Sequence, residues 1–456
     1  MFLRFLYLYW IFAYECSSFY CKNFIRRWIL GRPTIDRVKL VKEITNRLED
    51  FNIVYVKVFQ SLCLEQGLLS EREKNYLMRY TDNVPYHTDE IDYNLLDYLE
   101  GNFGIYVENR RPVNSGIVGI VFKGVKRVMT EKAEKAEKAE KAEKTDNETD
   151  TRVVIKMLKR GIAERYNSAY NELEMIAKYM AYIPYINSIN YSKMIGDSKE
   201  SILAQTDFTK ERDNIILFNE KYRFNKEFVL PQVYGEITDA FNSVIVMTDI
   251  TGLRFRDIKN YDDDVKYRFA TLLQKFGILS ILYHSCIQND IHAGNVFFYI
   301  NDTDEKESKP RYQLGVIDFG LCYFPSPENQ SAYYNFFYDI LCEQDYSKIT
   351  NVIPVLIDNK SKYSAFSSEI KSLIFDEVKQ CIKQYTKKNL DVNFILNLTR
   401  IFRSYGLEFT QEFNNICMGL QVTNSLCLSL SQELYKITCE LMNEMTQIDR
   451  LLEIED

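Results

Sequence analysis

The spacing of hydrophobic residues changes near residue 104, which divides the chain into differently patterned regions. Before this point apolar residues recur every three or four positions, as at Val38, Val41, Ile44 and Leu48. This period is that of one face of a helix, so residues 36–103 are predicted to be mainly helical.

Shorter apolar runs follow, and they predict strands rather than helices. The runs 117–122 and 153–155 are rich in Ile and Val and predict strands of a twisted sheet, and residues 244–247 predict a further strand. From residue 268 onward the pattern again predicts mainly helices. The expected architecture is therefore α+β, with the sheet preceding a largely helical region.

Composition limits the classes of function that fit this pattern. With 456 residues, 46% hydrophobic and 14% aromatic, the chain can bury a core in two lobes or domains. Its net charge of -7 gives no indication of a nucleic-acid surface. The chain has ten cysteines, none in a C-x-x-C pair, and three histidines, which does not favour a structural zinc site or a Ser-His-Asp or Cys-His catalytic site. The thiols are expected to be buried or reduced.

Two segments stand apart from the predicted body. Within residues 1–35, Phe5 to Tyr14 is an uncharged aromatic run that is too short to span a bilayer and is followed by arginines. This segment fits organelle targeting, a membrane contact or an amphipathic helix packed on the main body. The Glu-Lys-Ala repeat at 131–145 is strongly solvated and is interpreted as an insertion at a hairpin tip.

The candidate chemistry is concentrated between residues 288 and 320. Asp290 precedes Asn295 by five positions, and Asp318 starts an Asp-Phe-Gly sequence after an apolar run. Phosphoryl transfer needs a carboxylate to orient the attacking group and oxygen ligands to hold Mg²⁺ on a triphosphate. Asp290 suits the first role, and Asn295 and Asp318 suit the second, so the pair predicts a protein-kinase-like fold that binds ATP and Mg²⁺.

Earlier residues supply the remaining parts of a nucleotide site in the expected order. Gly116 and Gly119 form a short glycine-rich loop that lets backbone N–H groups approach phosphates. Lys156 follows an apolar strand and can offset phosphate charge, and Glu211, on a predicted helix, is the candidate partner of this lysine. Met247, at the end of the strand 244–247, completes the expected nucleotide-binding set.

Several motifs together resemble the UbiB or aarF-domain family of atypical kinases over roughly residues 51–431. The extension motif K-x-G-Q matches Lys57 to Gln60, although Phe59 replaces its glycine, and Gln288-Asn289 replaces the His-Ala before the catalytic aspartate. The other matching segments are Leu68-Leu-Ser-Glu71, Asp82-Asn-Val-Pro85, Lys156-Met-Leu-Lys-Arg-Gly-Ile162, Gln205-Thr-Asp-Phe-Thr-Lys-Glu-Arg-Asp-Asn214, Leu230-Pro-Gln-Val-Tyr234 and Asp290-Ile-His-Ala-Gly-Asn295.

The resemblance implies a two-lobed kinase-like fold with a helical extension over the active site and a largely helical C-lobe. It assigns Lys57 and Gln60 to the pocket side of the extension, Lys156 and Glu211 to an ion pair, and His292 to a structural role in its loop. The implied divisions are a targeting or membrane-contact segment (1–35), the extension (36–103), an N-lobe (104–250) and a C-lobe (251–456).

The resemblance further implies an ATP- and Mg²⁺-dependent kinase or ATPase linked to isoprenoid lipids, often coenzyme Q, at a membrane. A prenylated lipid, lipid-biosynthesis proteins and a membrane surface are the expected partners, and a mitochondrial location is expected if the organism is eukaryotic. Two alternatives stay open: a nucleotide-binding pseudokinase scaffold and a true protein serine/threonine kinase.

Overall fold

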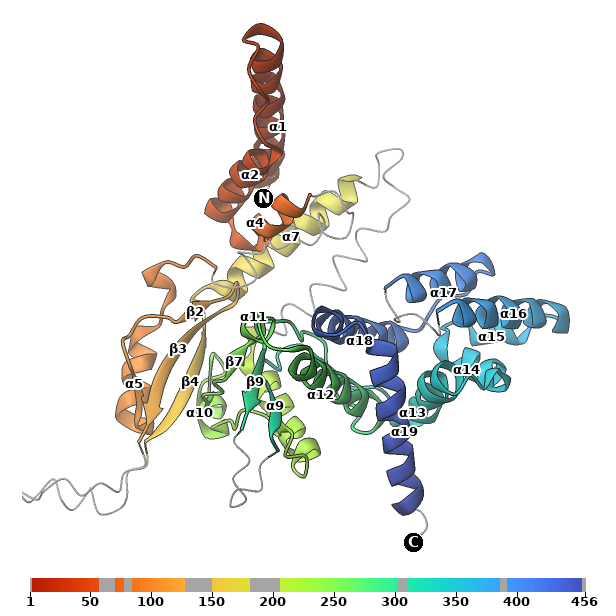
Figure 1. Ribbon diagram of the computed structural model, residues 1–456. Helices are drawn as coiled ribbons and strands as arrows, with labels where there is room; N and C mark the ends of the chain where they lie inside the picture. The colour runs from red at the N-terminus through yellow and green to blue at the C-terminus, as the bar shows by residue number, and fades with distance from the viewer. Residues whose placement is uncertain are drawn as a thin grey trace, which may run out of the picture. The chain divides into compact units, whose positions relative to one another are not determined.

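The computed structural model divides the chain into two compact units, each described here by itself (Figure 1). Unit 1 comprises Met1–Lys210 and Val233–Asp249, and unit 2 comprises Glu211–Gln232 and Ile250–Asp456. Residues 211–232, assigned to the N-lobe from the sequence, thus group with unit 2. The described residues are 2–56, 70–77, 84–127, 150–180, 206–301, 310–385 and 392–452.

The start of unit 1 is helical, as the spacing of apolar residues predicts. Asp36 accepts a hydrogen bond from the Val38 N–H (3.0 Å) and so caps the second helix. Leu8 and Ile11 of the first helix are buried against the apolar stripe of this second helix, and the two helices lie side by side (Figure 1). The helices of this region are α1 (Phe2–Phe24), α2 (Arg37–Phe51), α4 (Glu71–Leu77), α5 (Tyr93–Phe103) and α7 (Ile162–Met180).

An antiparallel five-stranded sheet forms the centre of unit 1. Its order is β1-β3-β4-β6, with β2 paired to β3, and the 126–151 pairing at the end of β3 and β4 makes these two strands a hairpin. Along β4, alternate residues are buried in a core shared with α5 and α10. The elements are β1 (Ile105–Val107), β2 (Asn114–Ser115), β3 (Gly119–Lys126), β4 (Thr151–Leu158), β6 (Val244–Thr248) and α10 (Gly235–Ala240).

One expected strand starts later than its apolar run suggests. Ile117 and Val118 lie in a turn and not in a strand, because the Gly116 N–H donates to the Gly119 carbonyl (2.8 Å) and reverses the chain there. The runs 119–122, 153–155 and 244–247 are strands as predicted. The Glu-Lys-Ala insertion, 131–145, lies outside the described residues.

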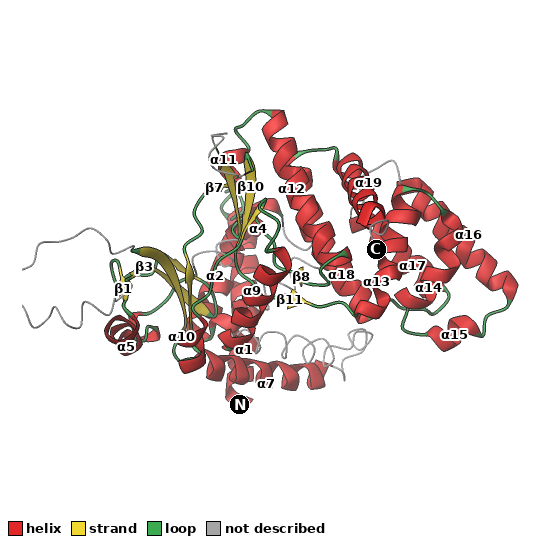
Figure 2. Ribbon diagram, turned by 90° about the horizontal axis from the view of Figure 1, so that it is seen from below, coloured by secondary structure: helices red, strands yellow, loops and turns green. Residues whose placement is uncertain are grey.

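Unit 2 combines a four-stranded sheet, a two-stranded sheet and many helices. The larger sheet has the order β5-β10-β9-β7, and the smaller pairs β11 with β8. The long helix α12 (Asp263–Leu282) contacts β10, α18 and α19 and carries much of the apolar core (Figure 2). The strands are β5 (Phe228–Val229), β7 (Leu253–Arg254), β8 (Ile287–Gln288), β9 (Val296–Ile300), β10 (Tyr312–Val316) and β11 (Cys322–Tyr323).

The rest of unit 2 is almost entirely helical, as the sequence predicts after residue 268. Within the described residues its helices after β11 are η5 (Pro327–Asn329), α13 (Gln330–Tyr334), the π-helix η6 (Asn335–Cys342), η7 (Tyr346–Lys348), α14 (Ile349–Leu356), α15 (Lys360–Ser364), α16 (Ser368–Tyr385), α17 (Val392–Ser404), α18 (Gln411–Leu430) and α19 (Leu434–Leu452). Before the sheet, unit 2 holds most of α9 (Phe208–Tyr222) and the short α11 (Phe255–Ile258).

Candidate active site

The loop between β8 and β9 is shaped by hydrogen bonds among its own residues. The Asn295 side-chain amide donates to the Asp290 carbonyl (3.0 Å), and the Asn295 N–H donates to the His292 carbonyl (2.9 Å). His292 Nδ1 accepts from the Gly294 N–H (3.0 Å), so this ring has a structural role in the loop. With its amide nitrogen so engaged, Asn295 keeps its side-chain oxygen for a cation.

The Asp-Phe-Gly sequence makes a strained turn after β10. Asp318 has φ +65°, which is uncommon for a residue other than glycine, and its side chain accepts from the Gly320 N–H (3.2 Å). Phe319 is fully buried and packs on Phe218, with 4.7 Å between ring centroids. The buried ring anchors the turn and thus fixes the Asp318 carboxylate, and backbone strain of this kind is concentrated at functional sites.

Gln288 joins the two loops. Its side-chain nitrogen donates to the Asp318 carbonyl (2.7 Å), and its side-chain oxygen accepts from the Asp290 N–H (3.0 Å). Gln288 is 2% exposed, whereas Asp290 and Asp318 are half-buried, so the Gln288 end of each bond is shielded from water. Gln288 thus replaces the expected histidine with a side chain that also has one donor and one acceptor. The sequence analysis noted this substitution but gave Gln288 no role.

Helix α9 supplies a second support for the turn. The Asn214 amide donates to the Phe319 carbonyl (2.7 Å). Glu211 is 3% exposed, and a Cβ added at Gly320 would lie 3.6 Å from its Oε2 and 3.3 Å from Asp318 Oδ1. Glycine at 320 therefore leaves room for two carboxylates side by side.

The Glu211 and Asp318 carboxylates affect the pKa of a nearby thiol, Cys322. Burial, followed by the neighbouring Cys286, Glu211 and Asp318, raises the pKa of the Cys322 thiol well above its ordinary value. Two carboxylates within one buried cluster favour a cation beside them. Unit 2 thus brings together four of the predicted residues: Glu211, Asp290, Asn295 and Asp318.

The other predicted nucleotide residues share one face of the unit 1 sheet. Lys156 lies directly between Val121 and Ile245 on the neighbouring strands, and Met247 is paired with Val154 two positions along. Directly paired residues point to the same side of a sheet, and this side is opposite to the core under α5. The Lys156 ammonium also lies 5.4 Å from the Phe208 ring centroid.

The glycine loop at the edge of this face is closed on itself. Since the Gly116 N–H is engaged by the Gly119 carbonyl, it serves the turn in this conformation. Gly119 is required for a different reason: a Cβ there would lie 3.2 Å from the Met157 carbonyl oxygen and 3.5 Å from the Phe208 ring. Close packing, not a left-handed backbone, selects glycine at 119.

Three predictions are not decided by this geometry. Lys57 and Gln60 lie outside the described residues. Lys156 belongs to unit 1 and Glu211 to unit 2, so their ion pair stays a prediction. Asn295 and Asp318 offer the oxygen ligands that Mg²⁺ prefers, and Mg²⁺ is commonly bound by one or two protein carboxylates plus phosphates and water. Among the described residues no group of three His, Cys, Asp or Glu residues able to hold a metal occurs.

Comparison with known proteins places these loops in context. Residues 141–353 match the ABC1 atypical kinase-like domain. A similar curated protein, an uncharacterized chloroplastic aarF domain-containing protein kinase of Arabidopsis thaliana (At5g05200), is 24% identical over 287 residues. The match covers 57% of this chain and 51% of that protein, so this chain matches about half the length of its relative.

Two solved structures align over more of the chain at low similarity. The complex of Rv3197 with erythromycin from Mycobacterium tuberculosis is 15% identical and covers 89% of this chain and 93% of that chain, with a TM-score of 0.47. The Rio2 kinase ADP/Mg²⁺-phosphoaspartate complex from Chaetomium thermophilum is 13% identical and covers 69% and 76%, with a TM-score of 0.30. The domain match and the mixed helix and sheet confirm the predicted α+β, kinase-like fold class.

Proposed function

Because residues 141–353 place this chain in the UbiB/aarF family of atypical kinases, we propose that it is an ATP- and Mg²⁺-dependent kinase or ATPase. The observation that carries this proposal is the hydrogen-bonded unit formed by Asp290, Asn295 and Asp318 through Gln288. A carboxylate, a carboxamide and a second carboxylate on two adjoining loops are what phosphoryl transfer requires.

Each residue of the proposed site has a distinct task. The Asp290 carboxylate accepts a proton from, or orients, the attacking hydroxyl or water. Asn295 and Asp318 would hold Mg²⁺, which supplies charge neutralisation for the triphosphate. Lys156 would neutralise phosphate charge from the face of the unit 1 sheet opposite to α5, with Glu211 as its counter-ion, and Gly116, Gly119 and Met247 would line the nucleotide.

Mg²⁺-dependent ADP release by the purified full chain tests this proposal. Asp318→Asn removes one anionic ligand and is expected to lower the rate at least 100-fold, whereas Asp345→Asn, at the start of η7 in unit 2, serves as the matched control with an unchanged rate. Equal rates for wild type and Asp318→Asn would remove the proposed chemistry.

A nucleotide-gated scaffold is a second candidate, and the closed glycine turn favours it. The Gly116 N–H donates within the turn, which reduces the number of donors that this loop offers to a phosphate. Thermal stabilisation by Mg²⁺-ATP without ADP release under any lipid condition would select the scaffold. Transfer of phosphate to a peptide library would instead select the third alternative, a protein serine/threonine kinase.

A link to isoprenoid lipid metabolism is proposed from the family resemblance alone, whereas the proposed membrane contact rests on α1 and the residues after it. No helix among the described residues is both long and apolar enough to cross a bilayer. Large aromatic side chains are nevertheless exposed in this region: Trp10 of α1 is 44% exposed, and Trp28, which follows α1, is 71% exposed. Arg26 and Arg27 lie next to Trp28 in the sequence. Aromatic residues beside arginines suit an interfacial contact with anionic lipid, such as a mitochondrial membrane offers.

Flotation with phosphatidylserine-containing vesicles tests the membrane proposal separately from catalysis. The double variant Trp10→Ser, Trp28→Ser is expected to lose at least tenfold in vesicle binding, since each exposed indole contributes to interfacial burial. Phe224→Ser, which removes an exposed aromatic residue of unit 2 (84% exposed), is the control. Vesicle binding that is equal in both variants would contradict a contact through this segment.

A further inference from the structure

Two helices of unit 2, η6 and α19, run side by side with an antiparallel register. The Tyr334 hydroxyl is 2.6 Å from the Thr446 hydroxyl, where α13 leads into η6, and the Tyr338 hydroxyl donates to the Asn443 side-chain oxygen (3.0 Å). A step of four residues forward along α13 and η6 thus corresponds to a step of about one turn backward along α19. The next step pairs Cys342 with Cys439.

The two thiols occupy the position that this register predicts. The Cys342 thiol donates to the Phe337 carbonyl within η6 (3.4 Å), and its sulfur, the Cys439 sulfur and the Tyr435 hydroxyl, one turn earlier on α19, influence one another electrostatically. Both cysteines are free and partly exposed, so a small oxidant can reach them. The register sets the two side chains opposite each other on adjoining helices, which is the arrangement that a disulfide between them requires.

We propose that Cys342 and Cys439 are a redox modification site, at which a peroxide converts the thiol pair into a disulfide that ties η6 to α19. Cys439 is the attacking sulfur. Its thiolate takes the terminal oxygen of the peroxide and becomes a sulfenic acid, and the O–O bond breaks with release of hydroxide or alkoxide. The Cys342 sulfur then attacks the Cys439 sulfur, and the S–OH bond breaks with loss of water.

The electrostatics of the pair agree with this order of events. The neighbouring Cys342 side chain has the largest effect on the pKa of Cys439 and lowers it; burial raises this pKa, Tyr435 lowers it further, and the Glu343 and Glu440 carboxylates raise it, with a net lowering. The neighbouring Cys439 and burial raise the pKa of Cys342. By contrast, burial raises the pKa of the Cys381 thiol to about 11, so the Cys381 thiol stays protonated at neutral pH.

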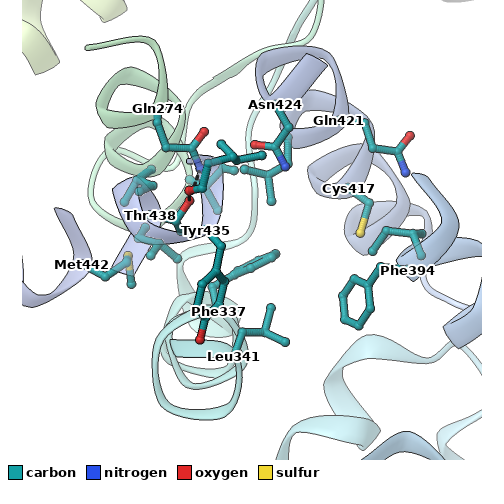
Figure 3. A pocket seen from close by; sticks show the side chains of 16 residues that line it. Gln274, Phe337, Leu341, Phe394, Cys417, Gln421, Asn424, Tyr435, Thr438 and Met442 are labelled. Carbon is teal, nitrogen blue, oxygen red and sulfur yellow. Dashed lines mark hydrogen bonds between the residues drawn. The ribbon is translucent and has the colours of Figure 1, made fainter. Parts of the chain in front are cut away.

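The proposed disulfide would join two helices, η6 and α19, that form part of the wall of an apolar cavity of about 50 Å³ (Figure 3). Phe337 and Leu341 of η6 and Tyr435, Thr438 and Met442 of α19 line it, and Leu341 and Thr438 precede the two cysteines in the sequence. A cavity between packed helices lets these helices shift relative to each other, whereas a covalent bond between them would fix their register. The disulfide would also close a loop of about 100 residues, which constrains the unfolded chain strongly.

The site can be mapped on the full chain without any assay of activity. The protein is exposed to hydrogen peroxide at neutral pH, free thiols are alkylated, and the chain is cleaved after glutamates without reduction. Cleavage yields peptide 329–343 with Cys342 and peptide 434–440 with Cys439, each with a single cysteine. We expect these two peptides to be linked, and the thermal midpoint to rise by roughly 5 °C or more and to return on reduction.

Variants provide the controls. Cys342→Ser and Cys439→Ser are expected to abolish the linked peptide and the rise in midpoint, whereas Cys21→Ser, at an exposed thiol of α1, retains both. If either variant fails to fold, the wild-type peptide map still decides. Recovery of Cys439 as sulfinic acid with Cys342 alkylated, or linkage of either cysteine to Cys322 or Cys381 with equal yield, would overturn the proposal.

Discussion

One cluster of polar groups in each unit surrounds a carboxylate, and the two clusters do so in different ways. In unit 1 like and unlike charges are buried together: Glu90 accepts from Arg165 and lies 3.6 Å from the Lys159 ammonium, with Glu90 4% and Lys159 2% exposed. In unit 2 one carboxylate, Glu412 at the start of α18, collects neutral donors from the segment that follows the Asp318 turn. These donors are Tyr333, Asn329 and the Ser326 hydroxyl and N–H.

The difference determines what each unit loses when one group is removed. A buried ammonium whose counter-ion is gone cannot regain its hydration, so the loss is large. Of the donors to Glu412, Asn329 and Ser326 are half-buried and can turn to water, whereas Tyr333 is fully buried and cannot, so the loss is smaller than for a buried ion pair but not negligible. The buried ion cluster of unit 1 should therefore be more sensitive to a single substitution than the Glu412 cluster of unit 2.

The largest expected effect is that of Glu90→Gln. Glu90 also accepts from the His87 N–H (3.1 Å), and the Lys159 ammonium donates to the Pro85 carbonyl (3.1 Å), so the substitution takes the nearest carboxylate from a buried cation. We expect a loss of roughly 3–5 kcal/mol in the free energy of unfolding, measured with urea.

Two controls isolate the buried charge. Glu100→Gln breaks an exposed pair with Arg110 and should cost less than about 1 kcal/mol. Adding Lys159→Met to Glu90→Gln removes the uncompensated cation and should recover part of the loss. If Glu90→Gln and Glu100→Gln cost the same, the contrast between the units would be wrong.

Glu412→Gln should have the next largest effect. Burial raises the pKa of Glu412, but hydrogen bonds from Tyr333, Asn329 and Ser326 outweigh it and hold the pKa below its ordinary value. Gln keeps one acceptor oxygen, so we expect a loss of about 1.5–3 kcal/mol at neutral pH, measured by urea unfolding.

The pH dependence of this variant gives a second check. The depressed pKa means that the carboxylate stabilises the protein above the unfolded pKa, about 4.3, and that this contribution disappears as pH falls through the folded pKa. The gap between wild type and Glu412→Gln should therefore narrow in acid. Glu408→Gln, exposed on the approach to α18, is the control. A constant gap would contradict the assigned charge.

The functional residues within each loop could be predicted from the sequence, but the hydrogen bonds that join one loop to another could not. Asp290, Asn295 and Asp318 are identifiable because their chemistry requires a fixed local spacing. Gln288 and Glu412 act through contacts with residues 30 and about 80 positions away, and such contacts leave no local pattern. The same holds for the strand boundary at Gly119, since apolar Ile117 and Val118 hide a turn that a backbone hydrogen bond makes.

Acid sensitivity offers a smaller effect within unit 2. Burial, followed by the neighbouring Lys221, lowers the pKa of His284 to about 4, and its ring packs on Tyr222 at 4.5 Å between centroids. Because the unfolded state binds a proton below about pH 6.5 and the folded state does not, stability falls as pH drops from 6.5 to 4. We expect on the order of 2 kcal/mol from this group at the acid end.

The comparison of His284→Gln with wild type measures this contribution. The variant should show a shallower decline of the urea midpoint between pH 6.5 and 4, whatever its stability at pH 7. An unchanged slope would mean that His284 is protonated equally in both states.

Gln288 should give the smallest change in stability and the sharpest test of how unit 2 arranges its loops. Gln288→Met removes the bonds to the Asp318 carbonyl and the Asp290 N–H. We expect the free energy of unfolding to fall by about 1–2 kcal/mol, because Asp290 and Asp318 are only half-buried and water can replace part of the lost bonding.

Gln288→His retains one donor and one acceptor while the ring is neutral, so at pH 8 it should lose less stability than Gln288→Met. Once the ring is protonated it has no acceptor for the Asp290 N–H, and the two variants should converge as pH falls below about 6.5. Urea unfolding of both variants across this range decides the matter: if His and Met cost the same at pH 8, the side chain at 288 fills space and does not couple the loops.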